Sequence, residues 1–279
     1  MKKASAALEL AGFRLNFKSD QGGIISVLRG RYGRFVSAGG AAYRFEVFEA
    51  SGGQNPFKPA ISLGKRFLKL KRGDFEAVLD MLTGAGTLKA AANERCLDAF
   101  LRSFISFLLI RSGGFMLHSA GLVKNGKAHL FLGKSGAGKS TLCGLATGRP
   151  AQVTGHKSQV ANRPPGCSVI SDELNLIRFE KGRFRVYGSP FWGEMRADGR
   201  PGAWPLGGVF LLKKAETNRL SPCSKAEALK WLLRCLVNFS RSPEDAALIM
   251  KNSARLLAGA GFSRLEFTKK DAGFLNLDW

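Results

Sequence analysis

A run of eight residues, Gly133-Lys134-Ser135-Gly136-Ala137-Gly138-Lys139-Ser140, constrains the fold of this chain more than any other feature. It fits the pattern G-x-x-x-x-G-K-S/T at every fixed position. Its glycines let successive backbone N–H groups converge on phosphate oxygens, because no Cβ stands in the way. A helix that begins at the end of such a loop adds its unpaired N–H groups and its dipole. The sequence therefore predicts a phosphate-binding loop between a strand and a helix.

Single residues of the loop have separate tasks. Lys139 supplies a positive charge to the β- and γ-phosphates, and the Ser140 hydroxyl is placed to ligate Mg²⁺. Thr141 can donate a hydrogen bond to an α-phosphate. The apolar run Leu130-Phe131-Leu132 precedes the loop, as expected of a buried strand. We expect the loop, Gly133 to Thr141, to bind a nucleoside triphosphate, ATP, together with Mg²⁺.

Such sites also need a carboxylate at the end of another strand. The segment Val169-Ile170-Ser171 runs directly into Asp172 and Glu173. Two adjacent acids at a strand end are costly unless a cation or a substrate hydroxyl lies beside them. Because strand side chains alternate between faces, we expect the two acids to point in opposite directions. A solvated turn is the alternative interpretation.

A histidine lies in the apolar stretch that precedes the loop. His118 belongs to the segment Met116 to Val123, which has the composition of a buried strand. By residue type alone, His118 could be a hydrogen-bonded core residue or a residue of the functional site, and both interpretations remain open.

Charge and cysteine content narrow the classes of function. The 43 Lys and Arg residues exceed the 21 Asp and Glu residues, which gives a net charge of +22 and attracts polyanions. No recognisable nucleic-acid-binding motif accompanies that charge, so we expect no nucleic-acid partner. The five cysteines lack C-x-x-C spacing, which indicates neither a disulfide framework nor a zinc site. Apolar stretches are too short to span a bilayer, and we expect a soluble, cytoplasmic protein.

The first 90 residues differ from the rest. Alternating runs at 13–17 and 43–48 have the period of strands. Glycine pairs mark turns between such runs: Gly22-Gly23, Gly39-Gly40 and Gly52-Gly53. We expect a small β-rich region of unknown role over residues 1–90 and a nucleotide-binding domain over residues 91–279.

The second region mixes helices and strands. Asn93 is expected to cap a helix that Gly113-Gly114 ends. Asn125-Gly126 predicts a hairpin turn between strands at 115–123 and 128–132. A helix is expected at 139–147. Further strands are expected at 169–171, 174–179, 184–187, 208–213 and 263–267.

Two helices are predicted near the end of the chain. Ser224 and Glu227 form a capping box before a helix over residues 228–239. Ser242 followed by Pro243 is typical of another helix start.

Three elements together resemble the HPr kinase/phosphorylase family. They are Leu117-His118-Ser119 with Gly121-Leu122-Val123, the loop Gly133 to Thr141, and Ser171-Asp172-Glu173. The segment Gly188 to Glu194 is similar to a Pro-Trp segment of kinase-like members. The resemblance covers about residues 93–279. It implies an α/β fold of the phosphoenolpyruvate carboxykinase type, with mixed sheets around the loop.

The resemblance also implies an activity. ATP and Mg²⁺ would serve to phosphorylate a serine of a protein or peptide acceptor, and the protein would form homo-oligomers. Lys139 would hold phosphates, and Ser140 and Glu173 would lie at the metal. Asp172 would be the base toward the acceptor hydroxyl, and His118 would orient the reacting groups. The alternative functions are a non-catalytic ATP-binding regulator or assembly factor, and a nucleic-acid-dependent ATPase.

Two features depart from the family. The second acid is Glu173, where the family has a second aspartate. The segment 148–166 is longer than in the family, and no acid occurs between Thr147 and Ser171. We expect this basic insertion to bind the acceptor or another acidic partner; a solvated loop is the alternative. No segment matches the one that recognises HPr, so a ribosomally made peptide is a second candidate acceptor.

Overall fold

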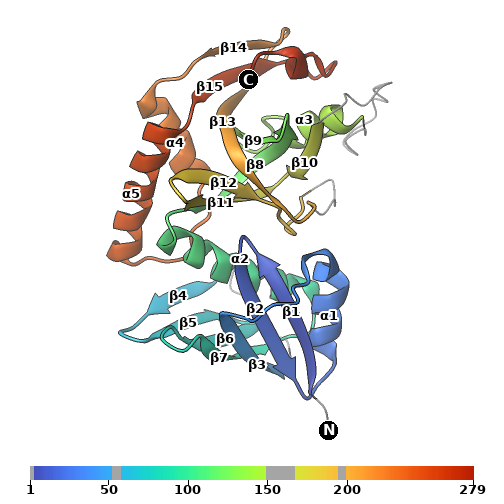
Figure 1. The fold of residues 1–279 in the computed structure, drawn as a ribbon, viewed down its shortest axis with the longest axis vertical. Helices are drawn as coiled ribbons and strands as arrows, with labels where there is room; N and C mark the ends of the chain where they lie inside the picture. Colours follow the sequence, from blue (N-terminus) through green and yellow to red (C-terminus); the bar gives the residue numbers. More distant parts are fainter. Residues whose placement is uncertain (1–2, 52–57, 149–166, 194–198) are drawn as a thin grey trace. The chain divides into compact units, whose positions relative to one another are not determined.

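The computed structural model describes residues 3–51, 58–148, 167–193 and 199–279. These residues form two compact units (Figure 1). The first comprises Met1–Arg111 with Asn238–Ala247, and the second comprises Ser112–Val237 with Leu248–Trp279. Each unit has its own mixed sheet, so the predicted mixed α/β class is confirmed. The functional division at residues 90 and 91 stays a prediction, and residues 149–166 of the basic insertion lie outside the described residues.

The first unit contains one seven-stranded sheet. Its strands are β1 (Ala4–Leu10), β2 (Phe13–Ser19), β3 (Tyr43–Glu49), β4 (Ala60–Leu63), β5 (Phe67–Arg72), β6 (Phe75–Asp80) and β7 (Ala85–Ala90). Their order is β1-β2-β3-β7-β6-β5-β4. The pairs β2–β3 and β3–β7 are parallel, and the others are antiparallel. The strands predicted at 13–17 and 43–48 are β2 and β3.

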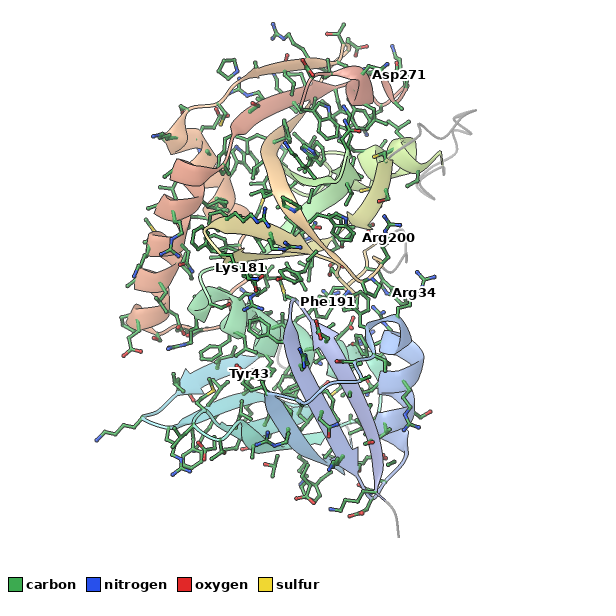
Figure 2. The ribbon with its side chains drawn as sticks, viewed as in Figure 1. Arg34, Tyr43, Lys181, Phe191, Arg200 and Asp271 are labelled. Carbon is green, nitrogen blue, oxygen red and sulfur yellow. The ribbon has the colours of Figure 1, made fainter. Side chains whose placement is uncertain are left out.

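Helix α2 (Glu94–Arg111) packs on one face of this sheet. The side-chain oxygen of Asn93 accepts a hydrogen bond from the Cys96 N–H at 3.0 Å, which confirms the predicted cap. Phe100 and Phe104 of α2 lie in an aromatic cluster with rings from the strands. Tyr43, labelled in Figure 2, lies edge-on to Phe104 with ring centroids 5.3 Å apart. This aromatic cluster is a core of the first unit.

One prediction for this region is wrong. Gly22-Gly23 does not mark a simple turn, because helix α1 (Gly23–Tyr32) begins there, followed by the short 3₁₀ helix η1 (Gly33–Phe35). The Ile24 N–H at the helix start donates to the Glu49 carboxylate at 3.0 Å. This partner comes from β3, so no nearby residue signals the helix start.

The second unit contains an eight-stranded sheet. Its strands are β8 (Phe115–Lys124), β9 (Lys127–Leu132), β10 (Cys167–Ser171), β11 (Leu174–Glu180), β12 (Arg183–Tyr187), β13 (Ala203–Lys214), β14 (Arg219–Pro222) and β15 (Phe262–Phe267). Its helices are α3 (Lys139–Thr147), α4 (Lys225–Cys235), the larger part of α5 (Pro243–Gly259) and the 3₁₀ helix η2 (Gly273–Asn276). The predicted bounds of α3 are confirmed.

Strand pairing in this unit forms a closed circuit. β8 pairs with β9 and with β11, while β13 pairs with both β12 and β9. β11 and β12 complete the circuit β8-β9-β13-β12-β11. Every one of these strands contributes to one buried apolar cluster, which includes Phe115, Leu130, Ile177, Val186 and Leu211.

Three neighbouring strands run parallel, and this arrangement positions the loop. β13 pairs in parallel with β9 on one side and with β15 on the other. Their carboxyl ends therefore meet at one edge of the sheet. The predicted loop follows Leu132 at the end of β9, so it lies at this edge of the sheet.

The helix predicted over 228–239 begins and ends too late in the sequence, because α4 spans Lys225–Cys235. The Ser224 hydroxyl accepts from the Glu227 N–H at 3.2 Å, which confirms the cap, but α4 already ends at Cys235. Leu236 is extended and forms a bridge with Leu117, and the Val237 N–H donates to the Met116 carbonyl. Pairing with β8 thus ends the helix early. The start predicted at Ser242 is confirmed, because its hydroxyl accepts from the Asp245 N–H.

Candidate functional site

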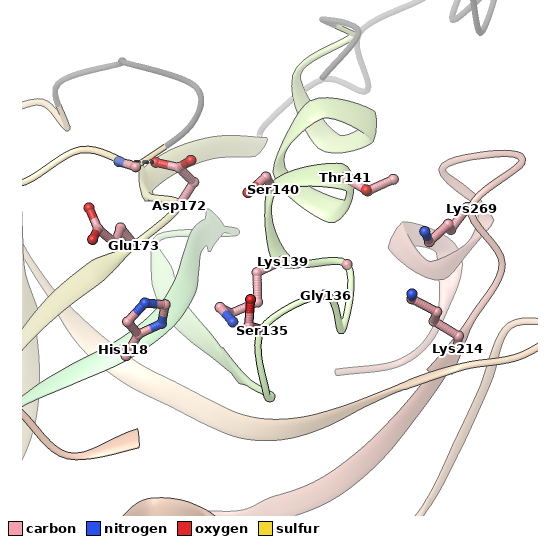
Figure 3. Close-up of a pocket in the computed structure, with 12 residues that line it drawn as sticks. His118, Ser135, Gly136, Lys139, Ser140, Thr141, Asp172, Glu173, Lys214 and Lys269 are labelled. Carbon is pink, nitrogen blue, oxygen red and sulfur yellow. Dashed lines mark hydrogen bonds between the residues drawn. The ribbon is translucent and has the colours of Figure 1, made fainter. Parts of the chain in front are cut away.

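A cavity of about 390 Å³ lies at the loop in the second unit. Figure 3 shows it with the loop and α3 in its centre, acidic side chains at one end and two lysines at the other. The lining residues are His118, Ser135, Gly136, Gly138, Lys139, Ser140, Thr141, Asp172, Glu173, Gly193, Lys214 and Lys269. The structure therefore brings together the loop, the acidic pair and the histidine that the sequence had proposed separately. Gly133, Lys134 and Ala137 belong to the loop but do not line the cavity.

The backbone of the loop depends on glycine. Gly136 has φ 74° and Gly138 has φ 102°, a region that favours glycine. A Cβ on Gly138 would stand 2.7 Å from the Phe267 ring, whereas around Gly136 nothing lies within 4 Å. Packing against Phe267 of β15 therefore requires glycine at position 138, whereas Gly136 leaves open space beside the cavity. A phosphate group fits such a cradle.

Lys139 is the first residue of α3 and is only 7% exposed. Its ammonium donates hydrogen bonds to the Gly133 carbonyl at 2.9 Å and to the Lys134 carbonyl at 3.2 Å. The lysine therefore lies folded along its own loop. Charged phosphate oxygens form stronger hydrogen bonds with an ammonium than neutral carbonyls do, so a bound phosphate would compete for it.

Asp172 follows the last residue of β10 and is 4% exposed. One carboxylate oxygen accepts a hydrogen bond from the Gly193 N–H at 3.0 Å, drawn in Figure 3. The preceding Ser171 hydroxyl donates to the Phe191 carbonyl and accepts from the N–H groups of Glu173 and Leu174. These bonds fix the bend after β10 and hold Asp172 at the cavity.

Both acids line the same cavity, and their opposite orientation stays a prediction. They lie in the bend between β10 and β11, where strand alternation does not apply. The Ser119 N–H of β8 donates to the Glu173 carbonyl at 2.9 Å. This bond ties the acidic bend to the strand that carries His118.

His118 is exposed and lines the cavity, so it is not a core histidine. Along β8 it alternates in step with Ala120 and Leu122, which pack in the apolar cluster that includes α3. The core histidine of this unit is His129, which is 3% exposed and whose Nδ1 has no hydrogen-bond partner within the described part of the chain. Burial, with the charges of Lys124 and Lys127, lowers the pKa of His129 to about 4.

Two lysines of the cavity were not predicted. Lys214 ends β13, and Lys269 follows β15. Neither belongs to a recognisable motif. Only the parallel pairing of β13 with both β15 and β9 brings them to the loop, and no local pattern in the sequence predicts that pairing.

A thiol also lies near the acidic end. Burial raises the pKa of Cys143 on α3 well above 9.0, and the nearby Asp172 carboxylate adds to this shift. Cys143 is fully enclosed in the core, and a neutral buried thiol is a poor nucleophile. The chemistry of this cavity therefore rests on its oxygen and nitrogen groups.

The oxygen atoms that line the cavity can be compared with those that a metal ion needs as ligands. Within the described ranges, no group of three or more His, Cys, Asp or Glu side chains is arranged to hold a metal. The cavity instead offers the Ser140 hydroxyl and the carboxylates of Asp172 and Glu173. Mg²⁺ prefers oxygen ligands and is usually held by one or two protein groups together with substrate phosphates. These residues fit Mg²⁺ bound with a nucleotide.

Comparisons with known proteins give no family. No family model matches the sequence, and no curated protein matches it. Among solved structures, this chain is similar to the Hpr(Ser) kinase/phosphatase from Coxiella burnetii, with 13% identity and a TM-score of 0.25. The similarity covers 50% of this chain and 86% of that one. A TM-score this low supports no conclusion, so the functional argument rests on the cavity. No described helix is long and apolar enough to cross a membrane.

Proposed function

We propose that this protein is an ATP- and Mg²⁺-dependent kinase that phosphorylates a serine of a protein or peptide. One observation supports this most: the glycine-rich loop, two carboxylates and a histidine line a single cavity. A protein that only binds nucleotide needs the loop, but it needs no buried carboxylate facing the same space. The acidic end of the cavity therefore favours group transfer over binding alone.

The loop is the proposed binding site for the triphosphate. Its glycines leave backbone N–H groups accessible, and the start of α3 adds the positive end of a helix dipole. Lys139 leaves the loop carbonyls and holds the β- and γ-phosphates. Mg²⁺ neutralises phosphate charge when bound, with Ser140 and Glu173 as its protein ligands. Thr141 donates to the α-phosphate.

Asp172 is the proposed base. The serine oxygen of the acceptor forms a new bond to the γ-phosphorus, and the bond between that phosphorus and the bridging oxygen breaks. ADP leaves with the electron pair, and the serine proton moves to the Asp172 carboxylate. General-base assistance of this kind contributes about 10²–10⁴ in rate. The Gly193 N–H keeps the carboxylate oriented, and His118 orients the groups from the neighbouring strand.

The test is transfer from ATP labelled in its γ-phosphate to a pool of serine-containing peptides, with and without Mg²⁺. We expect Mg²⁺-dependent phosphoserine, identified by mass spectrometry. A pool in which serine is replaced by alanine is the control. Tight Mg·ATP binding without transfer to any acceptor would instead favour a non-catalytic ATP-binding regulator.

A further inference from the structure

The lysines at the far end of the cavity need a separate explanation. Lys214 pairs in register with Phe267 of β15, and Lys269 follows two residues later. Because β9, β13 and β15 are parallel, both lysines leave the sheet at the edge where the loop begins. They come from two strands that are far apart in sequence and pair in parallel along the length of β15.

Their charge environment differs from that of the lysines next to them. Lys213 pairs with Glu266 at 2.8 Å, and Lys270 pairs with Glu216 at 3.3 Å. Lys214 and Lys269 have no such carboxylate within the described residues and lie beside each other instead. Contact with the Lys269 ammonium, together with its charge, lowers the pKa of Lys214 below its usual 10.5. Two adjacent ammonium groups without an acid are a site that favours an anion.

The first residues of α3 face different ends of the cavity. In Figure 3, Ser140 lies on the side of Asp172, whereas Thr141 extends toward Lys269. All four residues line the same cavity. The acids and the lysines therefore lie at opposite ends of the space beside the loop.

We infer that Lys214 and Lys269 form a subsite for the phosphate next to the ribose, the α-phosphate of the bound nucleotide. The inference rests on the proposed nucleotide site and adds the direction in which the triphosphate lies in it. The triphosphate lies with its γ-phosphate at Asp172 and its nucleoside end beyond the lysine pair. Because ADP and ATP share the α-phosphate, the lysines contribute equally to binding both, and they contribute little to the transfer step.

The experiment compares ADP and Mg·ATP affinity of the parent protein with a Lys214→Met/Lys269→Met variant. Methionine keeps the apolar length of the side chain and removes the charge. We expect both dissociation constants to rise about tenfold or more, by the same factor, because a charge-assisted contact to phosphate is lost.

The matched control is the Lys213→Met/Lys270→Met variant, which removes the same number of charges from the same two strand ends. Both of these lysines are exposed and form surface ion pairs. Such pairs contribute little, so ADP affinity should change by less than about threefold. An equal loss in both double variants would show that only general positive charge matters, which would overturn the subsite.

Proton uptake gives a second readout. An anion between the lysines restores the protonated form of Lys214, so ADP binding takes up protons at alkaline pH below 10.5. The charges around the pair are Lys213 with Glu266, Lys270 with Glu216, and Lys139 across the cavity. Calorimetry in buffers of different ionisation enthalpy measures the uptake. The proton uptake should disappear in Lys214→Met. It should shrink in Lys269→Met, because the Lys269 ammonium lowers the pKa of Lys214 in the parent protein.

The outcomes separate the inference from the proposed function. If the parent binds ADP and the Lys214→Met/Lys269→Met variant binds it equally well, the subsite is wrong and the nucleotide site stands. If that variant instead raises only the KM for the peptide acceptor, the lysines bind the acceptor, which also overturns the inference. If the parent binds neither ADP nor ATP, both the subsite and the proposed function fail.

Discussion

The two units of this protein use charged side chains differently. In the first unit, acids are matched by bases within the fold: Asp74 accepts two bonds of 2.6 Å from Arg72, and Asp80 pairs with Arg66. The second unit also has such pairs, among them Lys213 with Glu266 and Arg264 with Glu227, but in addition Asp172, Glu173, Lys214 and Lys269 line one cavity. Charges matched internally stabilise a fold, whereas a cluster of charged groups along a cavity marks a candidate functional site. The proposed nucleotide site lies in the second unit.

The largest effect is expected in the core of the first unit. Phe100 is fully buried and contacts the rings of Phe17, Phe45, Phe75 and Phe104. Phe100→Ala should lower the free energy of unfolding by about 3–5 kcal/mol, because it removes the central ring and leaves a cavity. Chemical denaturation of the variant and the parent measures this. The folded variant should keep its Mg·ATP affinity; a loss of affinity would contradict the separation of tasks between the units.

Mild acid should destabilise the second unit through the buried side chain of His129. The pKa of His129 is about 4 when folded and 6.5 when unfolded, so the unfolded chain binds more protons between these values. The contribution of neutral His129 to the free energy of unfolding is therefore fully present above pH 6.5 and is lost as the pH drops toward 4. The total loss is about 3 kcal/mol. Residues 1–111 contain no histidine, so this term is confined to the second unit.

Hydrogen exchange at pH 7 and pH 4.5 measures that loss unit by unit. Strands β9 and β13 should lose protection more than β2 and β3 do. His129→Gln is the matched variant, because it keeps a polar side chain but cannot titrate. If the variant shows the same acid dependence as the parent, His129 is not the cause.

The acidic end of the cavity should affect the rate more than the affinity. Asp172→Asn keeps the size of the side chain and the bond from the Gly193 N–H, but it removes the basicity. We expect transfer to a serine acceptor to fall by about a hundredfold or more, with Mg·ATP affinity within a few-fold of the parent. Single-turnover transfer beside a nucleotide titration separates the two quantities. An affinity that collapses with the rate would make Asp172 a metal ligand and Glu173 the better candidate for the base.

Sequence reasoning succeeded where the determinants are local. The bounds of α3 and the Asn125-Gly126 hairpin follow from short patterns, and the structure confirms both, with positive φ at each hairpin residue. Helix α1 was missed because the Ile24 N–H at its start is paired with Glu49 from a distant strand. The end of α4 was missed because Leu236 pairs with β8.

The same distinction applies to the candidate site. The loop and the acidic pair are visible as short runs, whereas Lys214 and Lys269 become neighbours only through strand pairing. His118 could not be assigned from its apolar surroundings, because those surroundings predict a buried side chain. Only its position at the cavity distinguishes it from His129.

The most direct test of the account is calorimetric titration of Mg·ATP into the parent protein and the Lys139→Ala variant. Lys251→Ala on the exposed surface of α5 is the control, because it removes one charge away from the cavity. We predict that the parent binds, that Lys251→Ala binds equally, and that Lys139→Ala binds at least about tenfold more weakly while remaining folded, since a charge-assisted phosphate contact is lost. Equal affinities of parent and Lys139→Ala would show that the loop is not the nucleotide site.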